Sequence, residues 1–402
     1  MFLPNRHPDH AAPLDPIDAA TLGPAGAARI EAFLAGFPEA RQTTLVALPA
    51  LARATGVAAV HLKDEGARLG LGSFKALGGA YAVALLVLEE AGRRLGRTLG
   101  FADLDDPAVR AVAAATTFAC ATDGNHGRSV AWGAARVGAR SVIFVHRGVS
   151  DARVAAIARY GAEMVRVEGS YDESVEEAAR VAAREGWTVV SDTSWPGYER
   201  IPGLVMQGYT AIVAEALRQL PAPPTHVFVQ CGVGGVAAAT AAHFALRLGP
   251  DRPRFVVVDP ARAACMFESA RAGHPVKVAE GEPTVMAMLD CYDPSPLAWR
   301  VLARVADGFM TIDEDEAVRV MRRLAEPLGG DPPVVAGESG GVGLAGFLRA
   351  AVDPAIRAAL RLDATARIFV VVTEGATDPA RYEHLVGRPP AAVAARSAGA
   401  VP

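Results

Sequence analysis

Lysine is nearly absent from this chain. Its 402 residues carry 40 basic side chains, of which only Lys63, Lys75 and Lys277 are lysines. An arginine guanidinium stays protonated, whereas a lysine amine can lose its proton in a protected site and attack a carbonyl carbon. Lys75 stands in the run Gly72-Ser73-Phe74-Lys75-Ala76, among small residues. A single lysine in such a run is most often a solvated side chain at the start of a helix, but two further motifs favour a chemical role.

Cysteines are also few, and the net charge is small. The four cysteines, Cys120, Cys231, Cys265 and Cys291, are widely separated, and the chain contains no Cys-x-x-Cys or His-Glu-x-x-His motif. This spacing argues against a structural zinc site or a disulfide framework, and we expect reduced thiols in a cytoplasmic protein without a bound metal. The net charge of -4 predicts no general attraction to nucleic acid or to an anionic membrane.

Long hydrophobic runs are absent as well. Residues 1–6 lack the apolar core of a secretory signal. The uncharged stretch 220–246 contains three prolines and several glycines, so it is interpreted as strand, turn and helix, not as a membrane span. With 51% hydrophobic and 21% charged residues, the composition is that of a globular chain long enough for two or three lobes.

Short apolar runs alternate with helical patterns from Val57 onward, which is typical of parallel sheets covered by helices. We therefore expect an α/β fold. The predicted strands lie at 142–145, 164–167, 187–190, 226–229, 255–258 and 368–372, and the helices between them at 150–160, 173–185 and up to 248. The first ~45 residues, rich in proline and alanine, are expected to wrap the surface.

The predicted elements fall into two groups. Residues 84–198 are expected to form a small inserted lobe, and residues 1–83 together with 199–402 a large lobe. Two α/β lobes arranged in this way place a crevice between the ends of their sheets.

The second motif is Thr122-Asp123-Gly124-Asn125-His126-Gly127, before an apolar helix at 128–137. Threonine, aspartate and asparagine in this place can simply cap the helix. Alternatively, Gly124 and Gly127 let backbone N–H groups converge on an anion, which the helix dipole also favours. A substrate carboxylate is the natural ligand of such a turn. The residues by themselves leave both interpretations open.

The third motif is Cys231-Gly232-Val233-Gly234-Gly235-Val236-Ala237, between a predicted strand and a helix. Its small residues permit close approach of amides to a phosphate. The run also fits Gly-x-Gly-x-x-Ala, with Asp259 about 20 residues beyond it, as in a dinucleotide-binding fold. A nicotinamide-dependent oxidoreductase is therefore an alternative, and a tight packing turn is another. The position past the middle of the chain weakens the dinucleotide alternative, which also leaves Lys75 and Asn125 without a task.

One cofactor, pyridoxal 5′-phosphate, uses all three motifs. It requires a lysine for its aldehyde, an amide cradle for its phosphate and a polar group for its phenolic oxygen. In this order, the runs Ser73-Phe74-Lys75 and Gly124-Asn125-His126 and the glycine-rich run 232–235 resemble the tryptophan synthase β-like (fold type II) pyridoxal-phosphate enzymes. The resemblance covers about residues 45–385 and implies a two-lobed fold, a small amino-acid substrate and a homodimer.

Several runs resemble one branch of this family, the diaminopropionate ammonia-lyases. These are Asp123-Gly124-Asn125-His126, where the dehydratases usually carry serine first, and the runs 191–199, 206–209, 337–340 and 373–378. The resemblance implies α,β-elimination from 2,3-diaminopropionate to pyruvate and two ammonia. A serine or threonine dehydratase with the same cofactor is the alternative. The enantiomer preference and any monovalent cation are left open.

The resemblance also implies roles for individual residues. Lys75 would bind the cofactor aldehyde and serve as a base at Cα, Asn125 would pair with the phenolic oxygen, and Thr373 would face the pyridine nitrogen. The phosphate would be held by the amides of Gly232, Val233, Gly234 and Gly235, and Glu338 would lie near the cofactor. The substrate would be bound by Thr122, Asp123, Gly124, His126, Tyr171 and Asp192.

Asp123 is the departure that demands a reason, because a carboxylate next to a carboxylate-binding turn repels the substrate. We hypothesise that Asp123 abstracts the Cα proton from the face opposite Lys75, so that both enantiomers react, or that it receives the second ammonium of the substrate. Taken singly, acids such as Asp123, Asp192 and Glu338 are more often helix caps or surface ion-pair partners.

Overall fold

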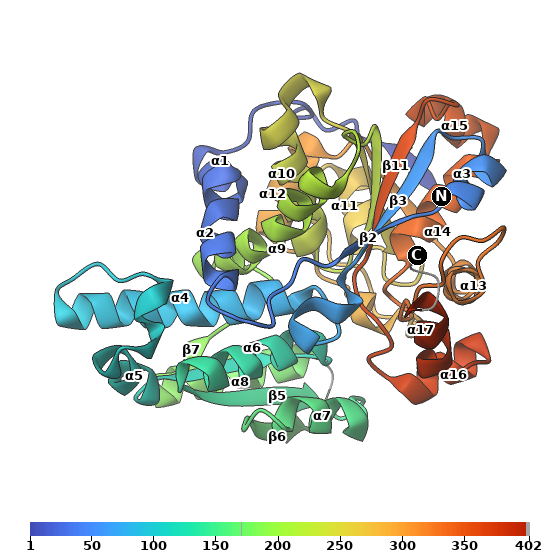
Figure 1. The fold of residues 1–402 in the computed structure, drawn as a ribbon. Helices are drawn as coiled ribbons and strands as arrows, with labels where there is room; N and C mark the ends of the chain where they lie inside the picture. The colour runs from blue at the N-terminus through green and yellow to red at the C-terminus, as the bar shows by residue number, and fades with distance from the viewer. Residues whose placement is uncertain (170, 399–402) are drawn as a thin grey trace.

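The computed structural model describes residues 1–169 and 171–398, which form two β-sheets with helices packed on their faces (Figure 1). The larger sheet has seven strands, in the order β1 (Phe2–Pro4), β10 (Gly308–Ile312), β9 (Arg254–Pro260), β8 (His226–Gln230), β11 (Arg367–Val372), β3 (Ala59–Asp64) and β2 (Thr44–Ala47). The five inner strands are parallel, and the edge strands β1 and β2 are antiparallel to their neighbours. The expected α/β class is confirmed.

The inner strands are buried on both faces, which explains their unbroken apolar sequences. In β8, Val227 and Val229 pack into one hydrophobic core and Phe228 into the other. One face is covered by α1 (Pro16–Leu22), α2 (Pro24–Leu34), α9 (Arg200–Gln219), α10 (Gly235–Leu248), α11 (Cys265–Ala272) and α12 (Pro296–Val305). The opposite face is covered by α3 (Pro49–Thr55), α13 (Glu314–Ala325), α14 (Val342–Val352) and α15 (Pro354–Leu360) (Figure 1).

The smaller sheet has four parallel strands, in the order β6 (Glu163–Val167), β5 (Arg140–His146), β4 (Thr117–Ala121) and β7 (Thr188–Val189). Helix α8 (Tyr171–Glu185) packs on its outer face, where Ala178 and Ala182 are buried. The side chains on the inner face of the smaller sheet pack into the same hydrophobic core as one face of the larger sheet. The elements around it are α5 (Pro107–Ala114), α6 (Asn125–Val137) and α7 (Asp151–Ala158), and the chain ends with α16 (Pro379–Val386) and α17 (Pro390–Ala398).

Helix α4 (Lys75–Leu95) connects the two sheets, since it packs against both α6 and α9. The expected lobe boundary between residues 83 and 84 falls inside this helix, where both side chains are buried. The division into 1–83 plus 199–402 and 84–198 therefore stays a proposal. None of the helices in the described ranges combines the length and the apolar character that crossing a bilayer requires.

The expectation that the first ~45 residues only wrap the surface is wrong. Ile30, Phe33 and Leu34 lie on one side of α2, at the spacing of an amphipathic helix, and all three are buried. The ring of Phe33 contacts that of Tyr81 in α4 with centroids 5.7 Å apart. Strand β1 adds an edge to the larger sheet by pairing with β10, and neither strand was predicted.

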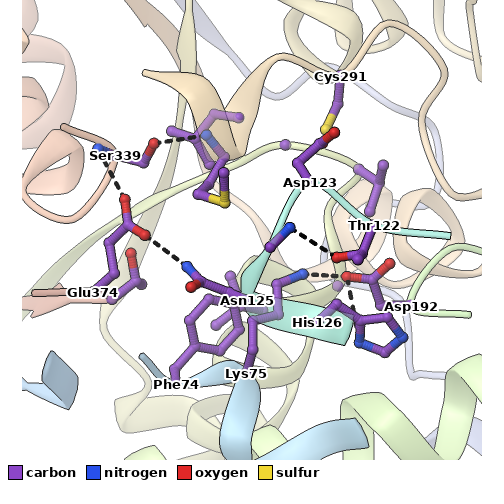
Figure 2. Close-up of a pocket in the computed structure, with 18 of the residues that line it drawn as sticks. Phe74, Lys75, Thr122, Asp123, Asn125, His126, Asp192, Cys291, Ser339 and Glu374 are labelled. Atoms are coloured by element: carbon purple, nitrogen blue, oxygen red, sulfur yellow. Dashed lines mark hydrogen bonds and ion pairs between the residues drawn. The ribbon is translucent and has the colours of Figure 1, made fainter. Parts of the chain in front are cut away.

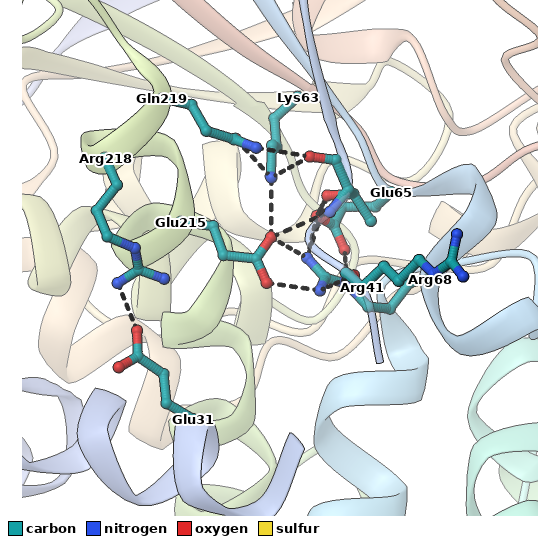
Figure 3. Close-up of polar contacts among 9 residues, drawn as sticks. Glu31, Arg41, Lys63, Glu65, Arg68, Glu215, Arg218 and Gln219 are labelled. Atoms are coloured by element: carbon teal, nitrogen blue, oxygen red, sulfur yellow. Dashed lines mark hydrogen bonds and ion pairs between the residues drawn. The ribbon is translucent and has the colours of Figure 1, made fainter. Parts of the chain in front are cut away.

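A cluster of buried charges fixes the segment that leads to Lys75 (Figure 3). We call Lys63, Glu65, Arg68 and Glu215 the buried charge cluster; it joins β3, the 3₁₀ helix η1 (Glu65–Gly70) and α9. The Lys63 ammonium donates to Thr43 O at 2.7 Å, and to Glu215 Oε2 and Gln219 Oε1 at 2.8 Å each. Arg68 binds both carboxylates, with Nη1 to Glu215 Oε1 at 2.7 Å and Nε to Glu65 Oε2 at 2.8 Å. Two cations and two anions balance one another there.

Candidate active site

A pocket lies where three strands of the two sheets end. Strand β4 of the smaller sheet and strands β8 and β11 of the larger sheet all contribute residues from their carboxyl ends, as does the start of α4 (Figure 2). Such ends are where open α/β sheets bind ligands. The residues that line the pocket are Phe74, Lys75, Ala121, Thr122, Asp123, Gly124, Asn125, His126, Tyr171, Asp192, Tyr209, Gln230, Gly232, Val233, Gly234, Gly235, Val236, Met288, Leu289, Cys291, Ser339, Thr373 and Glu374.

Lys75 is the first residue of α4, and its side chain enters the pocket. The preceding residue is held by a hydrogen bond from Phe74 N to Thr373 O at 2.9 Å. The ammonium of Lys75 forms an ion pair with the carboxylate of Asp192. Burial lowers the pKa of Lys75, but the Asp192 carboxylate outweighs burial, so the pKa lies above its ordinary value.

Asp192 and His126 face each other beside Lys75 (Figure 2). Burial raises the pKa of Asp192, yet the ammonium of Lys75 reverses this effect and holds the pKa below its usual range. His126 Nε2 lies 2.8 Å from the carbonyl oxygen of Val190. A carbonyl only accepts, so Nε2 carries the proton, and Nδ1, 3.9 Å from Asp192, faces the pocket as an acceptor. Burial lowers the pKa of His126, which favours this neutral form.

The turn before α6 caps its helix, which is one of its two expected roles. Thr122 Oγ1 accepts hydrogen bonds from the backbone N–H groups of Gly124 and Gly127 at 3.0 Å each, so Thr122 does cap the helix. A Cβ at Gly127 would come within 2.3 Å of Thr122 Cγ2, which is why this position requires glycine. The side chains of Asn125 and His126 line the pocket at the amino end of α6, where an anion is favoured.

The glycine-rich run forms the amino end of α10. Gly234 has φ +108°, and a Cβ there would lie 2.6 Å from Met266 Cε. No side chain caps this helix from its N-cap position. The residues around its start that line the pocket are Gly232, Val233, Gly234 and Gly235. A helix of 14 residues with an uncapped, glycine-rich start is suited to a phosphate.

Thr373 is positioned by a residue that sequence reasoning missed. Gln230, at the end of β8, donates from Nε2 to Thr373 Oγ1 at 2.7 Å. The Gln230 side chain is itself fixed, because its Oε1 accepts from Gly343 N at 3.1 Å. Since the Thr373 oxygen accepts from Gln230, its own hydrogen is available to an acceptor in the pocket, such as an unprotonated ring nitrogen.

Asp123 lies in the pocket and also faces an adjoining, larger cleft. Its Oδ1 is 2.9 Å from His146 Nε2. His146 Nδ1 accepts from the backbone N–H of Gly148 at 3.1 Å, so the proton of the neutral ring is on Nε2, next to Asp123. Tyr171, the first residue of α8, lines both cavities, and burial raises its pKa well above the ordinary value.

Glu338 is the one predicted site residue that the structure does not place on the pocket. Its carboxylate is buried behind Ser339 and pairs with Arg153 at 2.9 Å and Arg381 at 3.4 Å. The prediction placed it near the cofactor because of its run, 337–340, of which Ser339 is the residue that lines the pocket. The direction of a side chain within such a run depends on local backbone geometry that the sequence pattern does not reveal.

Sequence reasoning missed several residues that line the pocket. Gln230 and Glu374 adjoin predicted residues at strand ends, so their positions carried a usable signal. Tyr209 lies within α9, and its ring packs against Phe74 with centroids 4.8 Å apart. No signal pointed to Cys291, which follows the short 3₁₀ helix η4 (Ala287–Leu289) in a long irregular segment.

The position of Asp259 argues against the alternative of a nicotinamide-dependent oxidoreductase. Asp259 is the next-to-last residue of β9, but it is buried and does not line the pocket. Its Oδ2 accepts from Phe267 N at 2.7 Å, and burial raises its pKa to about 8. A ribose hydroxyl therefore has no exposed carboxylate to bind at this strand end.

The residues of the pocket fit pyridoxal phosphate. They present a primary amine (Lys75), an amide-rich helix start (232–235), an amide side chain (Asn125) and a hydroxyl with a free hydrogen (Thr373) within one cavity. These are the groups needed by an aldehyde, a phosphate, a phenolic oxygen and a pyridine nitrogen, respectively.

Comparisons with known proteins agree with this fit. The family model described as pyridoxal-phosphate dependent enzyme matches residues 37–374. The chain is 38% identical to the diaminopropionate ammonia-lyase of Escherichia coli strain K12 over 352 residues, 86% of this chain and 87% of that protein. The biosynthetic L-threonine dehydratase of Salmonella typhimurium is 30% identical over 233 residues, 56% of this chain and 41% of that protein.

A solved structure extends the likeness to the fold. It is the E. coli diaminopropionate ammonia lyase in complex with an aminoacrylate–PLP azomethine reaction intermediate. Its TM-score is 0.86 at 34% sequence identity, with 96% of each chain covered.

Proposed function

Because this chain belongs to the pyridoxal-phosphate dependent enzymes and, among them, to the diaminopropionate ammonia-lyase family, we propose that it converts 2,3-diaminopropionate and one water into pyruvate and two ammonia. Pyridoxal phosphate, when bound, supplies the electron sink that makes the Cα–H bond of an amino acid acidic. The supporting observation is that Lys75 and two carboxyl side chains, Asp123 and Asp192, line the same pocket, which fits this cofactor.

Each predicted site residue except Glu338 has a place in this proposal. Lys75 carries the cofactor and moves a proton at Cα. The phosphate is held by the amides of Gly232, Val233, Gly234 and Gly235, the phenolic oxygen by Asn125, and the ring nitrogen by Thr373. A hydroxyl partner cannot hold the ring nitrogen protonated as a carboxylate can, so the sink is moderate, which suits elimination more than transamination.

The substrate has one carboxylate and two amines, and the pocket offers complementary groups. The carboxylate is bound at the turn of Thr122, Gly124 and His126, at the positive end of α6. Asp192 remains ionised, because Lys75 holds its pKa low, so it can accept a hydrogen bond from an ammonium. Tyr171 and Asp123 close the side of the pocket toward the adjoining cleft.

Asp123 is proposed as the second base. It comes from the turn after β4, whereas Lys75 comes from the start of α4, so the two groups reach the pocket from separate elements. With a base on each face of Cα, both enantiomers of the substrate react. Asp123→Asn then reduces turnover of one enantiomer by at least about a hundredfold and leaves the other within about threefold. Equal losses on the D- and L-substrates, measured as pyruvate release, would eliminate the two-base proposal.

The reaction itself is tested by its stoichiometry. Purified protein with pyridoxal phosphate should show a visible absorption band, and borohydride should trap the cofactor on Lys75. Incubation with 2,3-diaminopropionate should release two ammonia per pyruvate, whereas a serine or threonine dehydratase releases one ammonia per keto acid. A higher kcat/KM for serine or threonine than for diaminopropionate would establish the dehydratase alternative instead.

We also propose that the protein acts as a homodimer in the cytoplasm. The resemblance to its family supports the dimer, and the four free cysteines support a reducing compartment. Light scattering of the purified protein measures the first, and fractionation of the source cells the second.

A further inference from the structure

Glu374 connects three segments of the pocket, although the sequence assigned it no role beyond its place in the run 373–378. It follows Thr373 at the carboxyl end of β11 and is buried. Its backbone forms an isolated antiparallel bridge with Ser73, two residues before Lys75. The next residue continues the pairing, since Gly375 N donates to Gly72 O at 3.0 Å. The backbone at Glu374 therefore fixes the segment that precedes Lys75.

The side chain of Glu374 makes a second connection, to the smaller sheet (Figure 2). Its Oε2 accepts from Asn125 Nδ2 at 2.6 Å, and its Oε1 accepts from Ser339 N at 3.3 Å. The surroundings leave it little freedom, because a Cβ at Gly337 would already lie 3.1 Å from its Cγ. An asparagine amide has two N–H groups. Glu374 takes one of them, and the other remains for a ligand of the pocket that both residues line.

Burial and the charges around Glu374 bring the pKa of its carboxyl group close to neutral pH. Burial and the neighbouring Glu338 raise the pKa of Glu374 to about 7, while Arg153 and the hydrogen bond from Asn125 act in the opposite direction. Arg128, on α6, faces the same carboxyl group. In either protonation state one oxygen can accept from Asn125, so the contact depends on the reach of the side chain more than on its charge.

We propose that Glu374 is a positioning residue, which turns the Asn125 amide toward the phenolic oxygen of the cofactor and sets it at a fixed place relative to Lys75. This inference rests on the proposed function, because it requires bound pyridoxal phosphate. Glu374 itself does not touch the reacting atoms; it acts through Asn125. The contact joins two segments that follow strands of different sheets, so it also fixes the position of Asn125 relative to the larger sheet.

Two substitutions separate reach from charge. Glu374→Gln keeps the length and an accepting oxygen but removes the charge, whereas Glu374→Asp keeps the charge but is one methylene too short to reach Asn125. The readouts are the dissociation constant of pyridoxal phosphate from the cofactor-free protein and the maximum of the visible band. We expect Glu374→Asp to weaken cofactor binding about tenfold, as Asn125→Ala does, and Glu374→Gln by less than about threefold. The visible band of Glu374→Asp should shift in the same direction as that of Asn125→Ala.

A double substitution tests whether Glu374 acts through Asn125. In the Asn125→Ala background, Glu374→Asp should cause no further loss of cofactor affinity, because the group it positions is gone. Glu338→Gln is the matched control: this neighbouring buried carboxylate does not bind Asn125, so its loss should lower thermal stability without moving the band.

The outcomes are distinct. A Glu374→Gln protein that behaves like Asn125→Ala, or additive losses in the double variant, would overturn the positioning role. If the wild-type protein itself failed to bind pyridoxal phosphate, the proposed function would fail first. Should Glu374→Asp not fold, Glu374→Gln compared with Asn125→Ala still decides the question.

Discussion

Lys63 and Lys75 are both withdrawn from solvent, yet their surroundings differ in every respect that matters for chemistry. The side chain of Lys63 is 0% exposed, and three oxygen atoms accept its three hydrogens (Figure 3). The side chain of Lys75 is 20% exposed and lines a pocket, and among the described residues its one hydrogen-bond partner is Asp192 (Figure 2). Lys63 has no room for another ligand, whereas Lys75 can exchange its one partner for an aldehyde.

The two lysines show that burial of a cation does not by itself indicate function. Burial lowers the pKa of Lys63 even though Glu215 and Glu65 oppose it. The amine is nevertheless inert, because every hydrogen is engaged and the side chain is fully buried. What distinguishes Lys75 is an incomplete set of partners next to open space. The predictions below test this contrast, starting with the largest effect.

Substitution of Lys75 should separate activity from stability. Lys75→Ala should lower kcat by at least about a thousandfold, because the amine that carries the cofactor is lost. The free energy of urea unfolding should change by less than about 2 kcal/mol, since only one partly exposed ion pair is removed. A variant that keeps the visible band, or full turnover, would contradict the assignment.

Substitution of Lys63 should have the reverse pattern. Lys63→Met leaves Glu65 and Glu215 buried with Arg68 as their only cation, and we expect a loss of about 3–5 kcal/mol in the free energy of unfolding. The folded fraction should still bind the cofactor. Lys277→Met, at an exposed position, is the matched control and should cost less than about 1 kcal/mol. Comparable losses in the two variants would remove the structural role of the buried charge cluster.

Asp192→Asn should make the amine of Lys75 reactive at lower pH. Burial lowers the pKa of Lys75, and in the native protein Asp192 more than compensates. Without this carboxylate the pKa falls, so the neutral amine, which attacks the aldehyde, is present at lower pH. The rate at which cofactor-free protein gains its visible band should therefore rise at least about tenfold near pH 7. An unchanged pH profile would mean that Asp192 does not control Lys75.

The smallest effect is expected at the edge of the buried charge cluster. Gln219→Ala removes one of the three acceptors of Lys63 and leaves Thr43 O and Glu215 in place. The expected loss is about 1 kcal/mol, the usual net value of one hydrogen bond. A loss as large as that of Lys63→Met would show that the Gln219 amide, and not the Glu215 carboxylate, contributes most to the stabilisation of Lys63.

Much of the fold was accessible from local patterns. The runs at 226–229, 255–258 and 368–372 are short, apolar and β-branched, and they do form β8, β9 and β11. Strand β10 was missed because Gly308 and Thr311 interrupt its apolar run. The burial of α2 was missed because alanine-rich sequence suggests a surface helix unless the spacing of Ile30 and Phe33 is considered.

The candidate site was predictable wherever chemistry and backbone form coincide in one short run. Lys75, the turn before α6 and the glycine-rich run before α10 all line the pocket, as their motifs suggested. Glu338 was predicted in the site but does not line the pocket, whereas Gln230 and Glu374, which were not predicted, do line it. Which neighbour in a run faces the pocket depends on backbone pairing with segments far away in the chain.

The sequence alone singled out the amine that we propose carries the cofactor, the glycine positions that only glycine can occupy and the alternation of strands and helices, because these depend on side-chain chemistry and on near neighbours. Only the tertiary structure decided that Lys63 is sealed and Lys75 open, that Asn125 meets Glu374 across 249 positions, and that Glu338 turns away. Contacts of this kind depend on the order of strands in two sheets, which local sequence does not encode.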